Sequence, residues 1–190
     1  MHRLGSAVWK WALWSGIVAA SWLGMQVVHE CGHVIGAVTS GGRVTHVELK
    51  PWTISRTDVE PNPRPLVERW AGPIAGCVLP VSAWLAVRPL RLPWAYLLRF
   101  FAGFCLIANG AYLGVGAAWP VGDAADILRI EPSRWPLAVF GILTVICGLL
   151  LWHRLGTNFG IGPHAATVNV RHAMGVWCVA GAIVLLESML

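Results

Sequence analysis

The chain has 190 residues, of which 56% are hydrophobic and 12% are charged, and its mean hydropathy is +0.63. Soluble globular domains carry about 25% charged residues, so this composition excludes that class and indicates a polytopic membrane protein in a lipid bilayer. The net charge of +5 does not indicate a nucleic-acid partner, because the basic residues flank the apolar segments and form no patch with interleaved aromatic residues.

Five apolar segments approach the roughly 20 residues that a helix needs to cross a bilayer. They lie at about residues 11–38, 68–87, 94–118, 136–152 and 172–189. The sequence therefore predicts an all-α, integral, multi-pass membrane protein with about five transmembrane helices. Lys and Arg are divided evenly between the two sets of loops, so the positive-inside rule assigns no orientation. The sequence gives no oligomeric state.

The first apolar segment contains the HExxH motif, His29-Glu30-Cys31-Gly32-His33. On a helix, His29 and His33 are i and i+4, so both imidazoles project from one face and can share a metal ion, with Glu30 beside them to handle a water proton. Ionisable groups within a span are costly to bury without partners and therefore indicate a functional site. We expect Zn²⁺ as the partner. The alternative is a helix that uses polar side chains for packing or interhelical hydrogen bonds.

Two features follow the motif. Polar and apolar residues alternate roughly over residues 43–59, which predicts a short strand or hairpin, and the proline-rich residues 60–65 then form a stiff turn into the second span. The second span carries the sequence AGPIAG at residues 71–76. Small residues let another helix approach closely, so we expect this sequence to pack against the helix that carries the HExxH motif.

The end of the third span supplies the candidates for a third metal ligand. Pro120 and Gly122 break or distort the helix there, which frees the chain to point Asp123 inward. Asp126 is the competing candidate, because it lies one turn further along if the chain stays helical. It could instead cap the following segment or face solvent.

Together these features resemble the site-2-protease family of intramembrane zinc metalloproteases. The resemblance rests on HECGH in a membrane helix, the Gly-Gly and strand-like segment after it, AGPIAG in the next helix and a late Asp at the end of the third, and it covers about residues 20–126. It implies a minimal member of the family, with a three-helix metalloprotease core over residues 1–130 and two additional transmembrane helices over residues 131–190.

The resemblance also implies a ligand set, with departures from the family pattern. Its third ligand would be Asp123, from a Leu-Asp-Gly-type motif of which this chain lacks both the Leu and the Gly. The family often has an Asn-x-x-Pro stretch shortly before that Asp, whereas Asn109 lies fourteen positions ahead of Asp123. One Zn²⁺ per chain would be held by His29, His33 and Asp123, and Glu30 would be the catalytic base.

The activity implied is hydrolysis of peptide bonds in transmembrane protein or peptide substrates, within or near the bilayer of a prokaryotic cytoplasmic membrane. Strand addition along residues 43–59 would hold an unwound substrate extended, with an ordinary structural hairpin as the alternative. Two other functions stay open. One is a proteolytically inactive membrane protein that uses a zinc-site fold to bind partners, against which the intact Glu30 argues. The other is a zinc-dependent membrane hydrolase that acts on other bonds.

Overall fold

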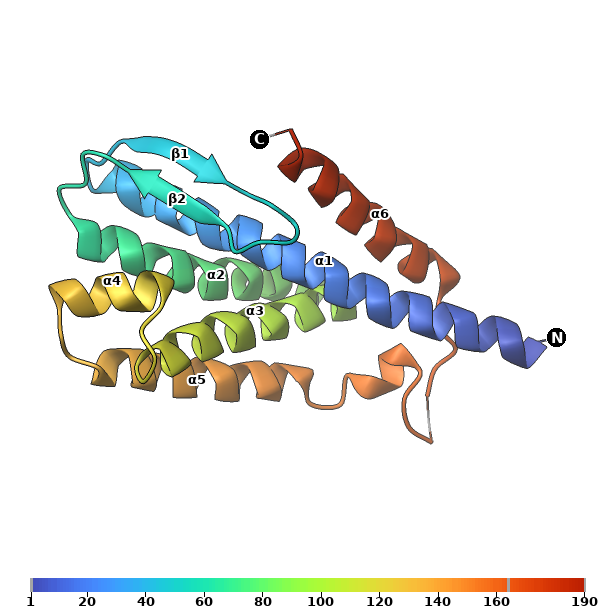
Figure 1. Cartoon of the computed structure of the whole chain (residues 1–190). Helices are drawn as coiled ribbons and strands as arrows, with labels where there is room; N and C mark the ends of the chain where they lie inside the picture. The colour runs from blue at the N-terminus through green and yellow to red at the C-terminus, as the bar shows by residue number, and fades with distance from the viewer. Residues whose placement is uncertain (1, 164, 190) are drawn as a thin grey trace.

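The computed structural model describes residues 2–163 and 165–189 and is mostly helical (Figure 1). Five helices are long and apolar enough to cross a membrane: α1 (His2–Thr39), α2 (Pro65–Val87), α3 (Ala95–Gly116), α5 (Trp135–Trp152) and α6 (Val170–Glu187). The remaining elements are β1 (Val44–Glu48), β2 (Arg56–Val59), the short helix α4 (Gly122–Ile130) and two 3₁₀ turns, η1 (Arg88–Leu90) and η2 (Gly156–Phe159). The predicted fold class is confirmed.

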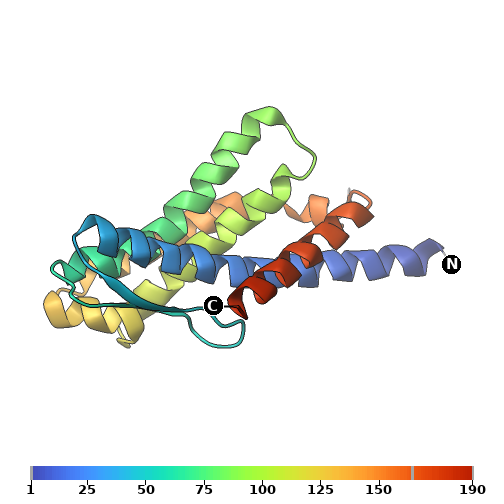
Figure 2. The same cartoon turned by 90° about the horizontal axis from the view of Figure 1, so that it is seen from above.

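Helix α1 is the longest element, with 38 residues. At 1.5 Å per residue it is about 57 Å long, nearly twice the hydrocarbon thickness of a bilayer. Its N-terminal part accordingly projects beyond the other helices (Figure 2). The helix continues without a break through the HExxH motif and closes at Gly41, whose φ of 84° is the left-handed conformation that glycine adopts readily. Both motif histidines therefore lie on one helix.

Small residues bring α1 and α2 into close contact. An added Cβ at Gly32 would lie 2.5 Å from the carbonyl oxygen of Ala71, and one at Gly36 would lie 2.4 Å from the Ala71 Cβ. Both distances are shorter than any real contact, so the two backbones approach as closely as they do only because glycine occupies these positions. The predicted packing of AGPIAG against the motif helix is confirmed.

Helices α3 and α5 lie on the same side of α1 as α2, and α6 lies on the opposite side (Figure 1). Helix α3 packs closely against α5, where a Cβ at Gly141 would lie 2.6 Å from the Gly114 Cα. Helix α6 lies on the other side of α1, away from α2, α3 and α5 (Figure 1). It contacts α1 where Val176 and Trp177 cover Gly16. As a result, α1 is packed on both sides along much of its length.

The hairpin predicted over residues 43–59 is present. Strands β1 and β2 pair antiparallel, from Val44 opposite Val59 to Glu48 opposite Arg56. An isolated two-stranded hairpin is marginally stable in water. Here it lies along the C-terminal half of α1 (Figures 1 and 2), to which it is hydrogen-bonded by residues described below.

The predicted break after the third span is also present. Helix α3 ends at Gly116, and the chain turns before α4 begins at Gly122, whose φ is 52°. A Cβ at Gly122 would lie 2.0 Å from the Tyr112 hydroxyl oxygen, so the turn has no room for a larger residue. Asp123 therefore lies in the first turn of a separate helix, which corrects its expected place at the end of the third span.

Candidate metal centre

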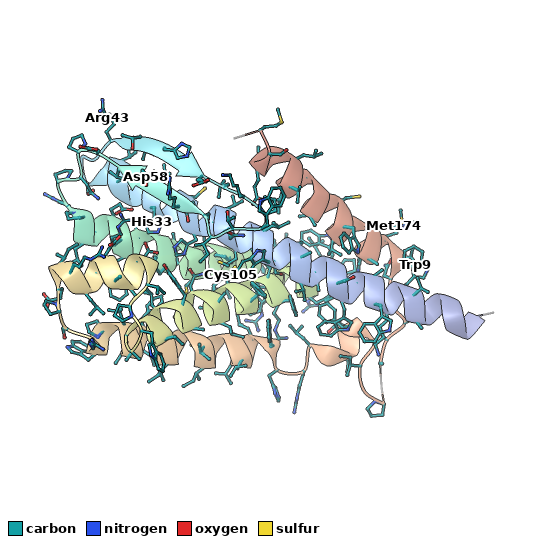
Figure 3. All side chains as sticks on the ribbon, in the orientation of Figure 1. Trp9, His33, Arg43, Asp58, Cys105 and Met174 are labelled. Atoms are coloured by element: carbon teal, nitrogen blue, oxygen red, sulfur yellow. The ribbon has the colours of Figure 1, made fainter. Side chains whose placement is uncertain are left out.

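Two side chains of α1 meet a side chain of α4 that lies 94 residues after the first of them in the sequence. The Nε2 atoms of His29 and His33 lie 3.1 Å apart, and the Asp123 Oδ2 lies 3.0 Å from the first and 3.3 Å from the second. All three residues are buried. Figure 3 shows His33 in the region enclosed by α1, α2 and α4. This group could hold a metal ion.

The hydrogen bonds behind the two histidines determine which ring nitrogens carry protons. The Asn109 amide donates from Nδ2 to the Cys105 carbonyl at 2.9 Å, which directs its Oδ1 at the His29 Nδ1, 2.6 Å away. The His33 Nδ1 lies 2.9 Å from the backbone oxygen of Glu68. Because both of these partners are acceptors, each Nδ1 must donate, and in the neutral rings both Nε2 atoms carry lone pairs.

The positions of these protons decide whether His29, His33 and Asp123 could hold a cation. With the protons on Nδ1, the two Nε2 atoms and the Asp123 Oδ2 are three acceptors that converge without a hydrogen between them. Their mutual repulsion would be relieved by a cation at the point where they meet. Imidazole nitrogen and carboxylate oxygen are ligands of Zn²⁺ and of other transition metals, so the donor set fits a divalent metal ion.

Outer partners support His33 and Asp123 as well. The Glu68 carboxylate is fully buried, and its Oε1 lies 2.9 Å from the His33 Nδ1. The Arg69 Nε lies 3.3 Å from the Glu68 Oε2, and the Arg69 Nη1 lies 3.7 Å from the Asp123 Oδ1. Outer partners of this kind hold metal ligands in orientation. Each of the three candidate ligands therefore has a polar side chain behind it.

Asp123 is suited to be the anionic member of the group. Its backbone N–H donates to the Tyr112 hydroxyl at 2.9 Å, which secures the first turn of α4. As a carboxylate, Asp123 would supply the negative charge that two neutral imidazole ligands lack.

Asp126, the competing candidate, lies one turn away and has other partners. Its carboxylate is 3.1 Å from the Arg69 Nε and 2.6 Å from the Arg129 Nη1. The structure thus brings Asp123 to the two histidines, while Asp126 forms ion pairs in the cavity wall beside them.

Glu30 lines the same cavity as the three candidate ligands and is held by the hairpin. Its side chain is buried, with the Ser55 hydroxyl donating to one carboxylate oxygen at 2.8 Å and the Thr57 hydroxyl donating to the other at 2.7 Å. The backbone N–H of Ser55 also donates to the Gln26 side chain at 3.2 Å. These contacts fasten the hairpin to α1 and fix the direction of the Glu30 carboxylate.

A cavity of about 680 Å³ opens beside these groups, which is within the usual size of a ligand pocket. His29, Glu30, His33 and Asp123 all line it, so the four residues predicted from the sequence face a common space. The rest of the wall combines charged residues with an apolar part, the latter formed by Trp22, Met25, Ile54 and Ala108.

The AGPIAG sequence contributes more than helix packing. A Cβ at Gly72 would lie 2.2 Å from the His33 Nε2, and one at Gly76 would lie 2.7 Å from the Asn109 Nδ2. Gly72 therefore provides the space that the His33 imidazole occupies, and Gly76 provides the space for the Asn109 amide that supports His29.

Several residues of this centre were not predicted. Asn109 had a signal, because a lone amide in an apolar span needs a partner. Ser55 and Thr57 had none, since they lie in a polar stretch, and Glu68 had none because it stands beside Arg69 at the very start of the predicted second span, where charged residues are common. No family model, curated protein or solved structure matches the chain.

Proposed function

We propose that this protein is an intramembrane zinc metalloprotease that hydrolyses peptide bonds of membrane-protein substrates. The proposal depends on one observation above all: three converging ligand atoms, with Glu30 beside them, face a single cavity in a bundle of helices long enough to cross a membrane. It also accords with the resemblance to site-2 proteases.

Zinc would be held by His29, His33 and Asp123. A zinc ion there would act as a Lewis acid and lower the pKa of a water molecule toward about 7. Side-chain and backbone groups of the protein position these ligands. The Asn109 amide and the Glu68 backbone carbonyl hold the imidazoles with Nε2 toward the ion, and ionised Asp123 supplies the negative charge that the neutral imidazoles lack.

Glu30 would act as the general base and then as the general acid. Its carboxylate would accept a proton from the attacking water and return it to the leaving amine. A carboxylate offers about four lone-pair sites, of which the Ser55 and Thr57 hydroxyls use two, so it keeps acceptor capacity for the water. The hairpin would in this way set the position of the base.

The substrate would be a transmembrane protein or peptide cut near one surface of the bilayer, in the proposed setting a prokaryotic cytoplasmic membrane. His33 lies six residues before the end of α1, or about 9 Å along the helix axis. The apolar part of the cavity wall suits the side chains of a membrane segment. Such a segment must unwind locally first, because its carbonyls are hydrogen-bonded within the helix.

The first test is metal content. Protein purified in detergent should contain about one zinc per chain by atomic emission spectrometry, and His29→Ala and His33→Ala should lose it. Equal metal content in these variants and the parent would rule out the site.

The second test is proteolysis. The parent should cleave at least one member of a broad panel of transmembrane substrates, whereas Glu30→Gln should keep its zinc and lose cleavage. Turnover retained in Glu30→Gln would show that another group is the base. A zinc-loaded parent that cleaves nothing in the panel would support a binding protein or a hydrolase of other bonds.

A further inference from the structure

The two ends of the helix bundle differ in charge. All nine acidic residues of the chain lie toward the end where α1, α3 and α6 finish and where the metal centre is. The opposite end is formed by the N-terminal part of α1 and by the α2–α3 and α5–α6 connections. We call it the basic end, because its charged residues with described side chains are all basic: Lys10, Arg88, Arg91, Arg99, Arg154 and Arg171. Figure 3 labels Trp9 at the basic end and Arg43 at the other.

The two ends of the bundle also differ in how many of their basic side chains form ion pairs. The end opposite the basic end, which we call the metal end, contains the candidate metal centre. There, basic side chains such as Arg56, Arg69 and Arg129 pair with carboxylates. None of the six basic side chains of the basic end named above forms such a pair, because all the acidic residues lie toward the metal end. Arg99 illustrates the outcome: its Nη2 donates to the His153 carbonyl at 3.0 Å, while its Nε is buried without a partner.

The basic end also lies at the level of a membrane surface. Helices α2, α3, α5 and α6 all begin or end there, and Trp94 and Trp152 stand at those helix ends. Tryptophan at span ends marks the headgroup region. Basic side chains without carboxylate partners attract anions, and the anions present at that depth are lipid phosphates. Guanidinium groups match phosphate oxygens in geometry and charge.

We propose that the basic end binds the headgroups of anionic phospholipids in the leaflet that it meets. The arginines of the two connections would contact the phosphodiester oxygens and thereby hold a shell of anionic lipid against the protein. This interaction is separate from the metal centre and stands whether or not the protein is a protease.

The test measures lipid selectivity in reconstituted bilayers. Spin-labelled phosphatidylglycerol and phosphatidylcholine are compared by electron paramagnetic resonance for association with the full-length protein. One variant combines Arg88→Gln, Arg91→Gln, Arg154→Gln and Arg171→Gln. The matched control removes the same number of charges at the metal end, with Arg43→Gln, Arg56→Gln, Arg64→Gln and Arg129→Gln.

The parent should prefer phosphatidylglycerol by roughly threefold or more at low salt, and the preference should fall toward one in about 0.5 M salt. It should also fall toward one in the basic-end variant and persist in the control. An absent preference in the parent, or an equal loss in both variants, would overturn the proposal. If the basic-end variant does not fold, the salt series on the parent decides, because a preference that salt does not reduce is not electrostatic.

Discussion

Gly72→Ala tests the geometry of the candidate metal centre with a single methyl group. The new Cβ would lie 2.2 Å from the His33 Nε2 and 2.6 Å from the Cδ2 and Cε1 of that ring. The ring would have to move by about 1.3 Å for its Nε2 to reach an ordinary contact of roughly 3.5 Å. It cannot pivot freely, because its Nδ1 donates to the Glu68 backbone oxygen at 2.9 Å.

The expected result is a loss of metal affinity with little loss of helix stability. Changes behind a metal ligand lower affinity by about 10 to 100-fold, and displacing the ligand atom itself should lower it by at least about 100-fold. In contrast, alanine is favoured over glycine inside a helix by up to about 1 kcal/mol, so α2 itself should not be weakened. Zinc affinity is measured on detergent-purified protein by competition with a chromogenic chelator.

Gly148→Ala is the matched control. Its Cβ would lie 2.6 Å from the Ile107 Cγ1 and 2.8 Å from the Gly103 carbonyl oxygen, in the α3–α5 interface and away from the metal centre. This variant should lower the thermal midpoint of unfolding while keeping the zinc affinity of the folded protein near that of the parent. If Gly72→Ala binds zinc as tightly as the parent does, then His33 does not face the ion as described.

Two further predictions concern the remaining groups. Asp123→Ala should weaken zinc binding by more than about 100-fold in the chelator competition, whereas Asp126→Ala should leave it within a fewfold of the parent; the reverse pattern would reassign the third ligand. Combining Ser55→Ala with Thr57→Val should lower kcat for a cleaved substrate at least about tenfold at unchanged zinc content, because the Glu30 carboxylate loses both hydroxyl partners. The hydroxyl-retaining pair Ser55→Thr and Thr57→Ser should recover most of kcat, and a failure to do so would point to packing rather than to the hydroxyl groups.

Features that depend on local spacing could be predicted from the sequence. The i, i+4 spacing of His29 and His33 brings both imidazoles to one helix face whatever surrounds the helix. Runs of apolar residues of sufficient length predicted the five long helices, and the alternation over residues 43–59 predicted the hairpin, because both patterns reflect burial along a single element.

Features that depend on how elements meet could not be predicted in the same way. The sequence indicated a break near Pro120, but only the packing of α4 shows that Asp123 approaches the histidines while Asp126 faces Arg69. The polar partners of Glu30 lie on the hairpin, 25 and 27 residues further along the chain. No spacing rule relates these positions, because the hairpin's path over α1 decides the contact.

The order of these residues along the chain has a consequence for how the site is assembled during synthesis. Asp123 follows His29 by 94 residues, and at about 5–20 residues per second this interval lasts on the order of 5–20 s. The backbone carbonyl of Glu68 arrives with the second span and the Asn109 amide with the third, so each imidazole gains its outer partner before the carboxylate exists. The complete set of candidate ligands forms only after α3 has been made and the chain has turned at Gly122. A nascent chain halted before that turn would carry two oriented imidazoles and no carboxylate beside them, so secure retention of any metal ion bound there should be a late event in its maturation.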